Sequence, residues 1–236
     1  MGKYLIVNAD DFGLSEGVNR GIIEAAEHGI VTSVSLMVRW PAATSAAAFV
    51  RHADKISIGL HLDFGEWFYR DGQWVSLYTV VPIEDEKAVA AEVARQMTEF
   101  VLLVGRNPTH IDSHQHVHRG EPVRSIVIDL AKQLKVPLRD FSPSVRYCGD
   151  FYGQGLEGES LPGVISVGGL KTILAAVPDG ITELGCHPGY DDGLKTAYRT
   201  ERGLETNVLC DPASRQALVD LEVKLCSFHS LPQVGS

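Results

Sequence analysis

The sequence predicts one α/β domain folded as a closed or distorted (β/α) barrel of the TIM type. Strand-like apolar runs and amphipathic helical runs alternate along the whole chain, with no internal repeat and no linker between them. The first strand-like run is not followed by G-x-G-x-x-G, and no P-loop is present, so the usual marks of a doubly wound nucleotide-binding sheet are missing. We therefore expect a single domain spanning residues 1–236.

Composition excludes several classes of protein. Of the 236 residues, 44% are hydrophobic and 22% charged, which is typical of an ordinary globular domain. The net charge of -9 and the lack of a basic run argue against nucleic acid and anionic membrane as partners. No apolar stretch has the length of a membrane span or of a signal peptide, and the four cysteines are scattered. We therefore expect a cytoplasmic protein with reduced thiols.

The first half of the chain shows a regular order of elements. We predict strands over 3–10, 31–38 and 57–64, and helices over 16–29, 42–53 and 86–105. Ser15 is placed to cap the first helix, and Gly29 and Gly105 are placed to end the first and the third.

The second half continues the alternation. We predict a strand beginning at residue 110, a helix over 121–135, strands over 137–142, 163–168 and 181–190, a helix opened by Asp211 and Pro212, and a last strand over 223–231. This order completes the expected parallel sheet.

Polar residues gather where the predicted strands end. They are Asn8, Asp10 and Asp11, then His61 and Asp63, then Asp112, His114, His116 and His118, then Arg139 and Asp140, then Glu183 and His187. In barrels of this type the active site lies at the carboxyl ends of the strands. An acidic and imidazole-rich edge therefore predicts a metal-dependent active site.

The adjacent carboxylates of Asp10 and Asp11 are the first candidates for function. One of them could bind a metal ion while the other takes a proton from water. The alternative is that one of them caps the following helix. We favour function, because two like charges directly after a buried strand are costly unless a cation lies between them.

The histidines leave several alternatives open. His61 alone would be an ordinary strand residue, and spacing does not decide which member of the 110–118 histidine run binds a metal. His187 is either a proton donor oriented by a carboxylate such as Glu183, or a turn residue in a His-Pro-Gly sequence. Arg139 either orients Asp10 or forms a structural ion pair.

An aromatic insertion follows the strand that contains His61. Trp67, Phe68, Tyr69 and Trp74 lie within residues 64–82, where their rings could stack on sugars as a lid or a subsite wall. The alternative is a hairpin that covers the barrel and turns at residues 70–72.

Several motifs, in this order, resemble the YdjC-like carbohydrate deacetylases, a family that includes diacetylchitobiose deacetylases. They are VNADDFGLSEGVNRGIIEAAEHGIVTSVSLMV, GLHLDFG, PTHIDSHQHVH, ELGCHPGY and YRTERGLETNVLCDP. The combination of ADDFG with DSH-x-H-V-H is the specific part, and the motifs cover nearly the whole chain.

This resemblance implies a distorted barrel with one divalent metal ion, most often magnesium, with zinc as the other candidate. It assigns the metal ligands to Asp11, His61 and His114. It also implies Asp10 as the base, paired with Arg139, and His187 as the acid. A homodimer is expected.

The expected reaction is hydrolysis of the N-acetyl group of an N-acetylated amino sugar or chitooligosaccharide, with release of acetate. Two alternatives remain open at this point. One is a metal-dependent phosphoesterase on the same barrel, which would need a second metal and several cationic side chains. The other is a non-catalytic sugar-binding protein that has kept the pocket.

Overall fold

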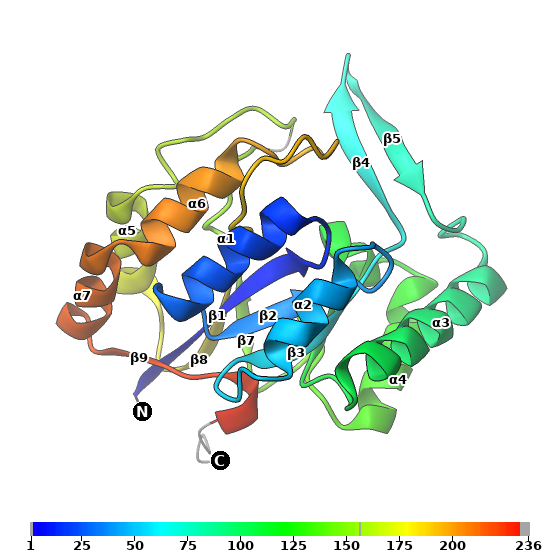
Figure 1. Ribbon diagram of the computed structural model, residues 1–236, viewed down its shortest axis with the longest axis horizontal. Coiled ribbons are helices and arrows are strands. Elements are labelled where there is room, and N and C mark those ends of the chain that lie inside the picture. The colour runs from blue at the N-terminus through cyan, green and yellow to red at the C-terminus, as the bar shows by residue number, and fades with distance from the viewer. Residues whose placement is uncertain (1, 156, 232–236) are drawn as a thin grey trace.

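A computed structural model describes residues 2–155 and 157–231. A curled, all-parallel sheet of seven strands runs through the middle of these residues, with helices around its outside (Figure 1). Its strands are β1 Lys3–Phe12, β2 Ser33–Leu36, β3 Ser57–Leu62, β6 Ile111–Ser113, β7 Arg146–Cys148, β8 Gly180–Cys186 and β9 Val223–Leu225. The order β6-β3-β2-β1-β8-β7, with β9 paired to β1, confirms the predicted distorted barrel. The limits 1–236 for the domain remain a prediction.

Strand β1 is the centre of the sheet. Residues 3–9 pair with β8 along one side. On the other side, residues 3–5 pair with β9, and the carboxyl-terminal part from Asn8 pairs with β2. From Leu5 to Phe12 every residue of the strand is buried, because both faces are covered.

The helices begin and end where the local sequence provides caps. They are α1 Glu16–Glu27, α2 Ala43–Val50, α3 Glu86–Val104, α4 Val123–Leu134, α5 Val167–Ala176, α6 Glu201–Cys210 and α7 Pro212–Asp220, with short 3₁₀ helices η1 His114–Arg119 and η2 Phe228–Ser230. The Ser15 hydroxyl accepts a hydrogen bond from the amide of Val18 at 3.1 Å, as an N-cap does. Gly105 ends α3 with φ +81°, a left-handed conformation that suits glycine. No described helix has both the length and the apolar character needed to cross a membrane.

Four predicted segments differ in the structure. Residues 163–168 form no strand, because Ser166 caps α5 by accepting from the amide of Gly169 at 2.9 Å. The strand expected over 137–142 is reduced to one bridge between Leu138 and Ile111. The strand that begins near residue 110 ends at Ser113 and turns into η1, and the last strand ends at Leu225. Helix α6 and strand β7 were not predicted.

The aromatic insertion is a two-stranded antiparallel hairpin, β4 Gly65–Arg70 and β5 Gln73–Thr79. Its turn is formed by Asp71 and Gly72, both with positive φ, which is the conformation of a tight two-residue hairpin turn. The predicted hairpin and its turn are therefore confirmed, but the hairpin does not cover the barrel as that alternative expected. It projects away from the sheet, beyond the carboxyl end of β1 (Figure 1).

Candidate active site

A bulge at the end of β1 places Asp10 and Asp11 on the same side. Ala9 is opposite Val34 of β2 and Phe12 is opposite Leu36, so β1 contains one residue more than its partner. Asp11 takes up the difference with φ +66°. Successive side chains of a regular strand point to opposite faces, whereas here both carboxylates line one pocket.

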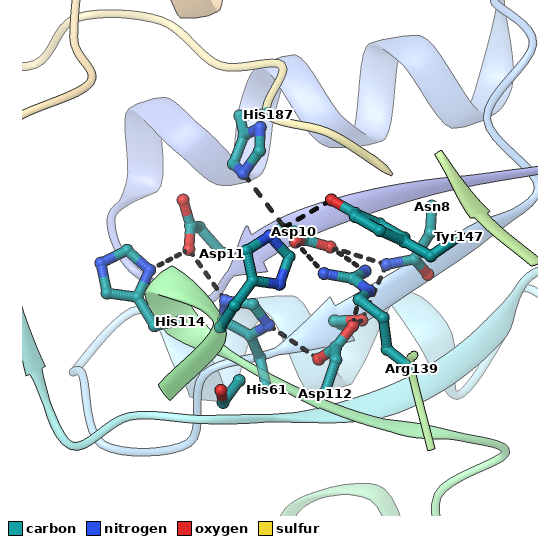
Figure 2. Close-up of polar contacts among 12 residues, drawn as sticks. Asn8, Asp10, Asp11, His61, Asp112, His114, Arg139, Tyr147 and His187 are labelled. Carbon is teal, nitrogen blue, oxygen red and sulfur yellow. Dashed lines mark hydrogen bonds and ion pairs between the residues drawn. The ribbon is translucent and has the colours of Figure 1, made fainter. Parts of the chain in front are cut away.

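The structure brings the three expected metal ligands together. One oxygen of Asp11, Oδ1, lies 3.2 Å from Nε2 of His61 and 2.9 Å from Nδ1 of His114 (Figure 2). Donor atoms at about 2.0–2.1 Å from a tetrahedral zinc ion stand about 3.3 Å apart, so these spacings fit a shared ion. All three side chains are buried. Asp11, His61 and His114 therefore have both the chemistry and the spacing of a metal site.

Charged neighbours hold these ligands in place. Nδ1 of His61 contacts Oδ1 of Asp112 at 2.8 Å, and Oδ2 of Asp11 accepts from Arg202 at 2.7 Å. Burial lowers the pKa of His61, but the carboxylates of Asp112 and Asp11 outweigh burial and raise this pKa to about 9. Burial raises the pKa of Asp11, but His114 and Arg202 bring it well below its usual value. Asp11 is therefore a carboxylate.

Asp10 belongs to a buried ion-pair network that meets the expected ligand group at Asp112. Its two oxygens accept from Arg139 at 2.6 and 2.8 Å, in the bidentate arrangement that a guanidinium makes with a carboxylate. Arg139 also contacts Glu183 at 2.6 Å and Asp112 at 2.7 Å. Burial raises the pKa of Asp10, but Arg139 outweighs burial and lowers it. The ion pair expected between Arg139 and Asp10 is thus present.

His187 lies beside Asp10, at the rim of the site. Its Nε2 is 3.8 Å from Oδ2 of Asp10 (Figure 2). The proposed orientation by Glu183 is wrong, because Glu183 contacts Arg139 instead. The acidic neighbour of His187 is Glu205 of α6, which accepts from the His187 backbone amide and has a carboxylate oxygen 4.0 Å from Nδ1. Burial lowers the pKa of His187 to about 4, so the ring is neutral at pH 7.

The other histidines of the 110–118 run have different contacts. His110 lies 3.0 Å from the Ser35 hydroxyl and stacks on Phe228. His118 lies 2.7 Å from the Ser113 hydroxyl, and the nearest partner of the His116 ring is the Tyr147 hydroxyl at 3.4 Å. Only His114 of this run is placed with Asp11 and His61.

A pocket of about 940 Å³ opens over these residues. Asp10, Asp11, His61, His114 and His187 line it on the sheet side, and Trp67 and Trp74 line it on the hairpin side. A second hollow of about 930 Å³ shares these two tryptophans and adds Phe68 and Tyr69. All four predicted aromatic residues therefore line one continuous cleft.

Three buried charged residues near the site were not singled out from the sequence. They are Glu66 of β4, and Arg202 and Glu205 of α6. Arg202 and Glu205 lie three residues apart on one helix, a spacing that places both on the same face. This spacing in the YRTERGLE segment was the signal that could have revealed them.

Comparison with known proteins decides the family. Residues 4–220 match the family model described as YdjC-like protein. The chain belongs to the YdjC-like family. Among other YdjC-like relatives, a chitooligosaccharide deacetylase of Serratia marcescens is 33% identical over 98% of this chain and 100% of its own length. A carbohydrate deacetylase of Geobacillus stearothermophilus is 34% identical over 97% of this chain and 98% of its own length.

Solved structures agree with the YdjC-like assignment at the level of fold. A candidate cellobiose-phosphate cleavage protein of Enterococcus faecalis superimposes with a TM-score of 0.80 at 25% identity, covering 99% of this chain and 100% of the other. A family 4 carbohydrate esterase of Streptomyces lividans in complex with acetate gives a TM-score of 0.57 at 12% identity, covering 95% and 91%. The second likeness supports a shared fold alone.

Proposed function

We propose that this YdjC-like protein hydrolyses the N-acetyl group of an N-acetylated amino sugar or chitooligosaccharide, releasing acetate and a free amine. One observation carries the proposal. Asp11 joins His61 and His114 at hydrogen-bond distance, directly beside the Arg139-bound Asp10, in a pocket large enough for a sugar. The names of the relatives that match this chain over nearly its whole length support the same reaction.

Asp11, His61 and His114 would hold one divalent ion. Such an ion, when bound, lowers the pKa of water and polarises the acetamide carbonyl. Two imidazoles and one carboxylate are the donors of many catalytic zinc sites, whereas Mg²⁺ prefers oxygen ligands. The donor set therefore supports zinc at least as well as the magnesium that the family resemblance implies.

Asp10 is the proposed base and His187 the proposed acid. Arg139 keeps Asp10 ionised, so its Oδ2 can take a proton from the attacking water. That oxygen lies 3.8 Å from Nε2 of His187, so a small approach of the ring would bring the two atoms within hydrogen-bond distance. The neutral His187 ring accepts this proton on Nε2 and, as the imidazolium, passes it to the nitrogen of the departing sugar as the C–N bond breaks. Addition of water across this bond yields acetate and the amine.

The phosphoesterase alternative fits less well. It needs a second metal, and two further groups of ligand-type residues are candidates. Asp10, His61 and Asp112 share His61 with the first site, and Arg139 already contacts both carboxylates. The other group is His116, His118 and Asp140. In that group Arg119 already contacts Asp140 at 2.8 Å, and Nε2 of His118 lies 3.2 Å from the carbonyl oxygen of Arg139. Arg139 itself is enclosed by carboxylates and is not available for phosphate.

Acetate release tests the proposal. The protein, loaded separately with Zn²⁺, Co²⁺ or Mg²⁺, should release acetate from a panel of N-acetylated chitooligosaccharides and should stop when a chelator is added. If metal binds but no substrate yields acetate, the sugar-binding alternative is favoured and the proposed reaction is wrong. Release that continues unchanged after chelation would remove the metal from the mechanism. The homodimer and the cytoplasmic location remain predictions.

A further inference from the structure

Glu66 occupies a position between three parts of the site. It is the second residue of β4 and is only 2% exposed. Its Oε1 accepts from the Ala197 amide at 2.6 Å and from the Thr196 hydroxyl at 2.7 Å. Its Oε2 lies 3.8 Å from Nε2 of His114. One carboxylate therefore connects the hairpin, the loop before α6 and a candidate metal ligand.

The two nitrogens of His114 have different surroundings. Nδ1 faces Asp11 at 2.9 Å. Nε2 is buried and has no hydrogen-bond partner among the described residues, and the Glu66 carboxylate is the acidic group in front of it. A buried N–H without an acceptor is costly, so a small approach of this ring and carboxylate would be favourable.

The surroundings of His61 show the same arrangement with the ring reversed. His61 presents Nε2 to Asp11 and Nδ1 to Asp112. His114 presents Nδ1 to Asp11 and Nε2 to Glu66. In metal sites the second nitrogen of a ligand histidine commonly donates to a carboxylate, which fixes the tautomer and the ring orientation. Each histidine of this site thus has its own carboxylate on the side away from Asp11.

We propose that Glu66 is the positioning residue of His114: it accepts the Nε2–H and so keeps the Nδ1 lone pair directed toward the metal. This inference rests on the proposed function, because it requires the ion at Asp11, His61 and His114. It goes further by assigning a role to a residue of the hairpin. The same carboxylate connects the substrate-binding walls to a metal ligand, through Thr196 and Ala197 on one side and β4 on the other.

Only a carboxylate satisfies all the contacts of Glu66. Oε1 faces two donors, and Oε2 faces the nitrogen that must donate when Nδ1 is a ligand. A glutamine would present its NH₂ group to a donor on one side or the other. Glu66→Gln therefore keeps the size of the side chain and removes one of these contacts.

The test compares Glu66→Gln with Glu92→Gln, measuring metal affinity in the absence of substrate. Glu92 is a matched control, since it is a buried carboxylate hydrogen-bonded to Arg95 and Gln96, away from the site. Calorimetry with Zn²⁺ should show affinity weakened about 10–100-fold in Glu66→Gln, the usual effect of losing an outer-shell partner, and nearly unchanged in the control. Nitrogen-15 NMR of the zinc-loaded wild type should show the His114 proton on Nε2.

Wild-type affinity in Glu66→Gln, or a His114 proton on Nδ1, would overturn the role of Glu66. If Glu66→Gln does not fold, Thr196→Val removes one donor to Glu66 and should cause a smaller loss of zinc affinity; unchanged affinity would overturn the proposal. The proposed function can fail separately. If the wild type releases no acetate but zinc binding is still weakened in Glu66→Gln, the positioning role of Glu66 is supported and deacetylation is rejected.

Discussion

The two walls of the active-site pocket differ in construction. The sheet wall consists of Asp10, Asp11, His61 and His114, each no more than 8% exposed and linked to its neighbours by ion pairs. The hairpin wall consists of aromatic rings on β4 and β5, and Trp74 is 60% exposed. In the proposed reaction, the chemistry would therefore take place on the buried parallel sheet and the sugar would be recognised by an attached, partly exposed element.

The hairpin wall has few attachments to the body at its pocket end. Besides Glu66, the Gln115 side chain accepts from the Trp67 amide at 2.9 Å and donates to the Trp67 carbonyl at 2.7 Å. Gln115 directly follows His114 and has a left-handed backbone with φ +49°. The attachment of the recognition wall is therefore next in sequence to a candidate metal ligand.

The largest expected effect comes from the sheet wall. Replacing His61 and His114 together with alanine should abolish zinc binding and reduce acetate release by roughly 1,000-fold or more, since the activated water is lost. Calorimetry and an acetate assay measure the two losses. Trp74→Ala is the control from the opposite wall and should bind zinc normally. A double variant that still releases acetate at the wild-type rate would place the site elsewhere.

Removing the cation of the sheet wall should be the next largest change. Arg139→Met leaves Asp10, Asp112 and Glu183 buried without their shared partner, and breaking such a network costs about 3–5 kcal/mol. Lysine should not restore the loss, because it cannot make the bidentate contact. Urea unfolding measures the effect.

Arg124→Met is the matched control for Arg139→Met. It removes an exposed pair with Glu121 and should lower the free energy of unfolding far less than Arg139→Met does. Equal losses in the two variants would show that the buried network has no special role.

Acid should destabilise the protein through a buried neutral histidine behind the sheet wall, His110. Burial lowers the pKa of His110 to about 4, so the unfolded chain takes up its proton first as the pH falls from about 6.5. The contribution of His110 to the free energy of unfolding is therefore complete above pH 6.5. As the pH falls from 6.5 to 4, this contribution decreases by up to about 3 kcal/mol. His110→Phe should show a smaller loss than wild type in unfolding measured at several pH values.

Phe228→Leu is the control for the titration of His110. It alters the ring that stacks on His110 at 3.9 Å but adds and removes no titrating group. Its free energy of unfolding should fall with pH as steeply as that of wild type. If His110→Phe is equally steep, His110 is not a source of the acid sensitivity.

The smallest effect is expected from the hairpin wall. Trp67→Ala and Trp74→Ala should raise KM for longer chitooligosaccharides while kcat is retained, because each ring contributes about 0.5–1.5 kcal/mol of stacking. Leu102→Ala, an exposed apolar residue of α3 that lines neither hollow, should change neither parameter. A fall in kcat with unchanged KM would contradict the separation of the two walls.

Local sequence was sufficient for much of the fold and for the centre of the site. Apolar runs and caps such as Ser15 and Gly105 gave β1, α1 and α3 within a few residues. Strand ends located the acidic and imidazole-rich edge. The choice of His114 within its histidine run came from the family resemblance and stays a prediction; in the structure β6 ends at Ser113 and His114 turns toward Asp11.

Contacts between distant segments could not be predicted in the same way. Glu183 was suggested as the partner of His187, which is near it in sequence. Instead, Glu183 accepts a hydrogen bond from the buried guanidinium of Arg139, which is 44 residues away in sequence. Residues 163–168 contain three β-branched residues, as a strand often does, yet Ser166 caps a helix and α5 begins directly after it. Glu66 reaches the site only through the tertiary packing of the hairpin against the loop before α6.

The bulge in β1 has a consequence for insertions and deletions. One extra residue between Ala9 and Phe12 allows two neighbouring carboxylates to share a pocket. Only Asp10 and Asp11 lie between these two residues, so deleting either one would restore a regular ladder with β2 and would remove one of the two carboxylates. The number of residues between Ala9 and Phe12 therefore matters as much as their chemistry. A relative with one residue fewer here would keep the fold but would have one carboxylate where the proposed mechanism needs both a ligand and a base.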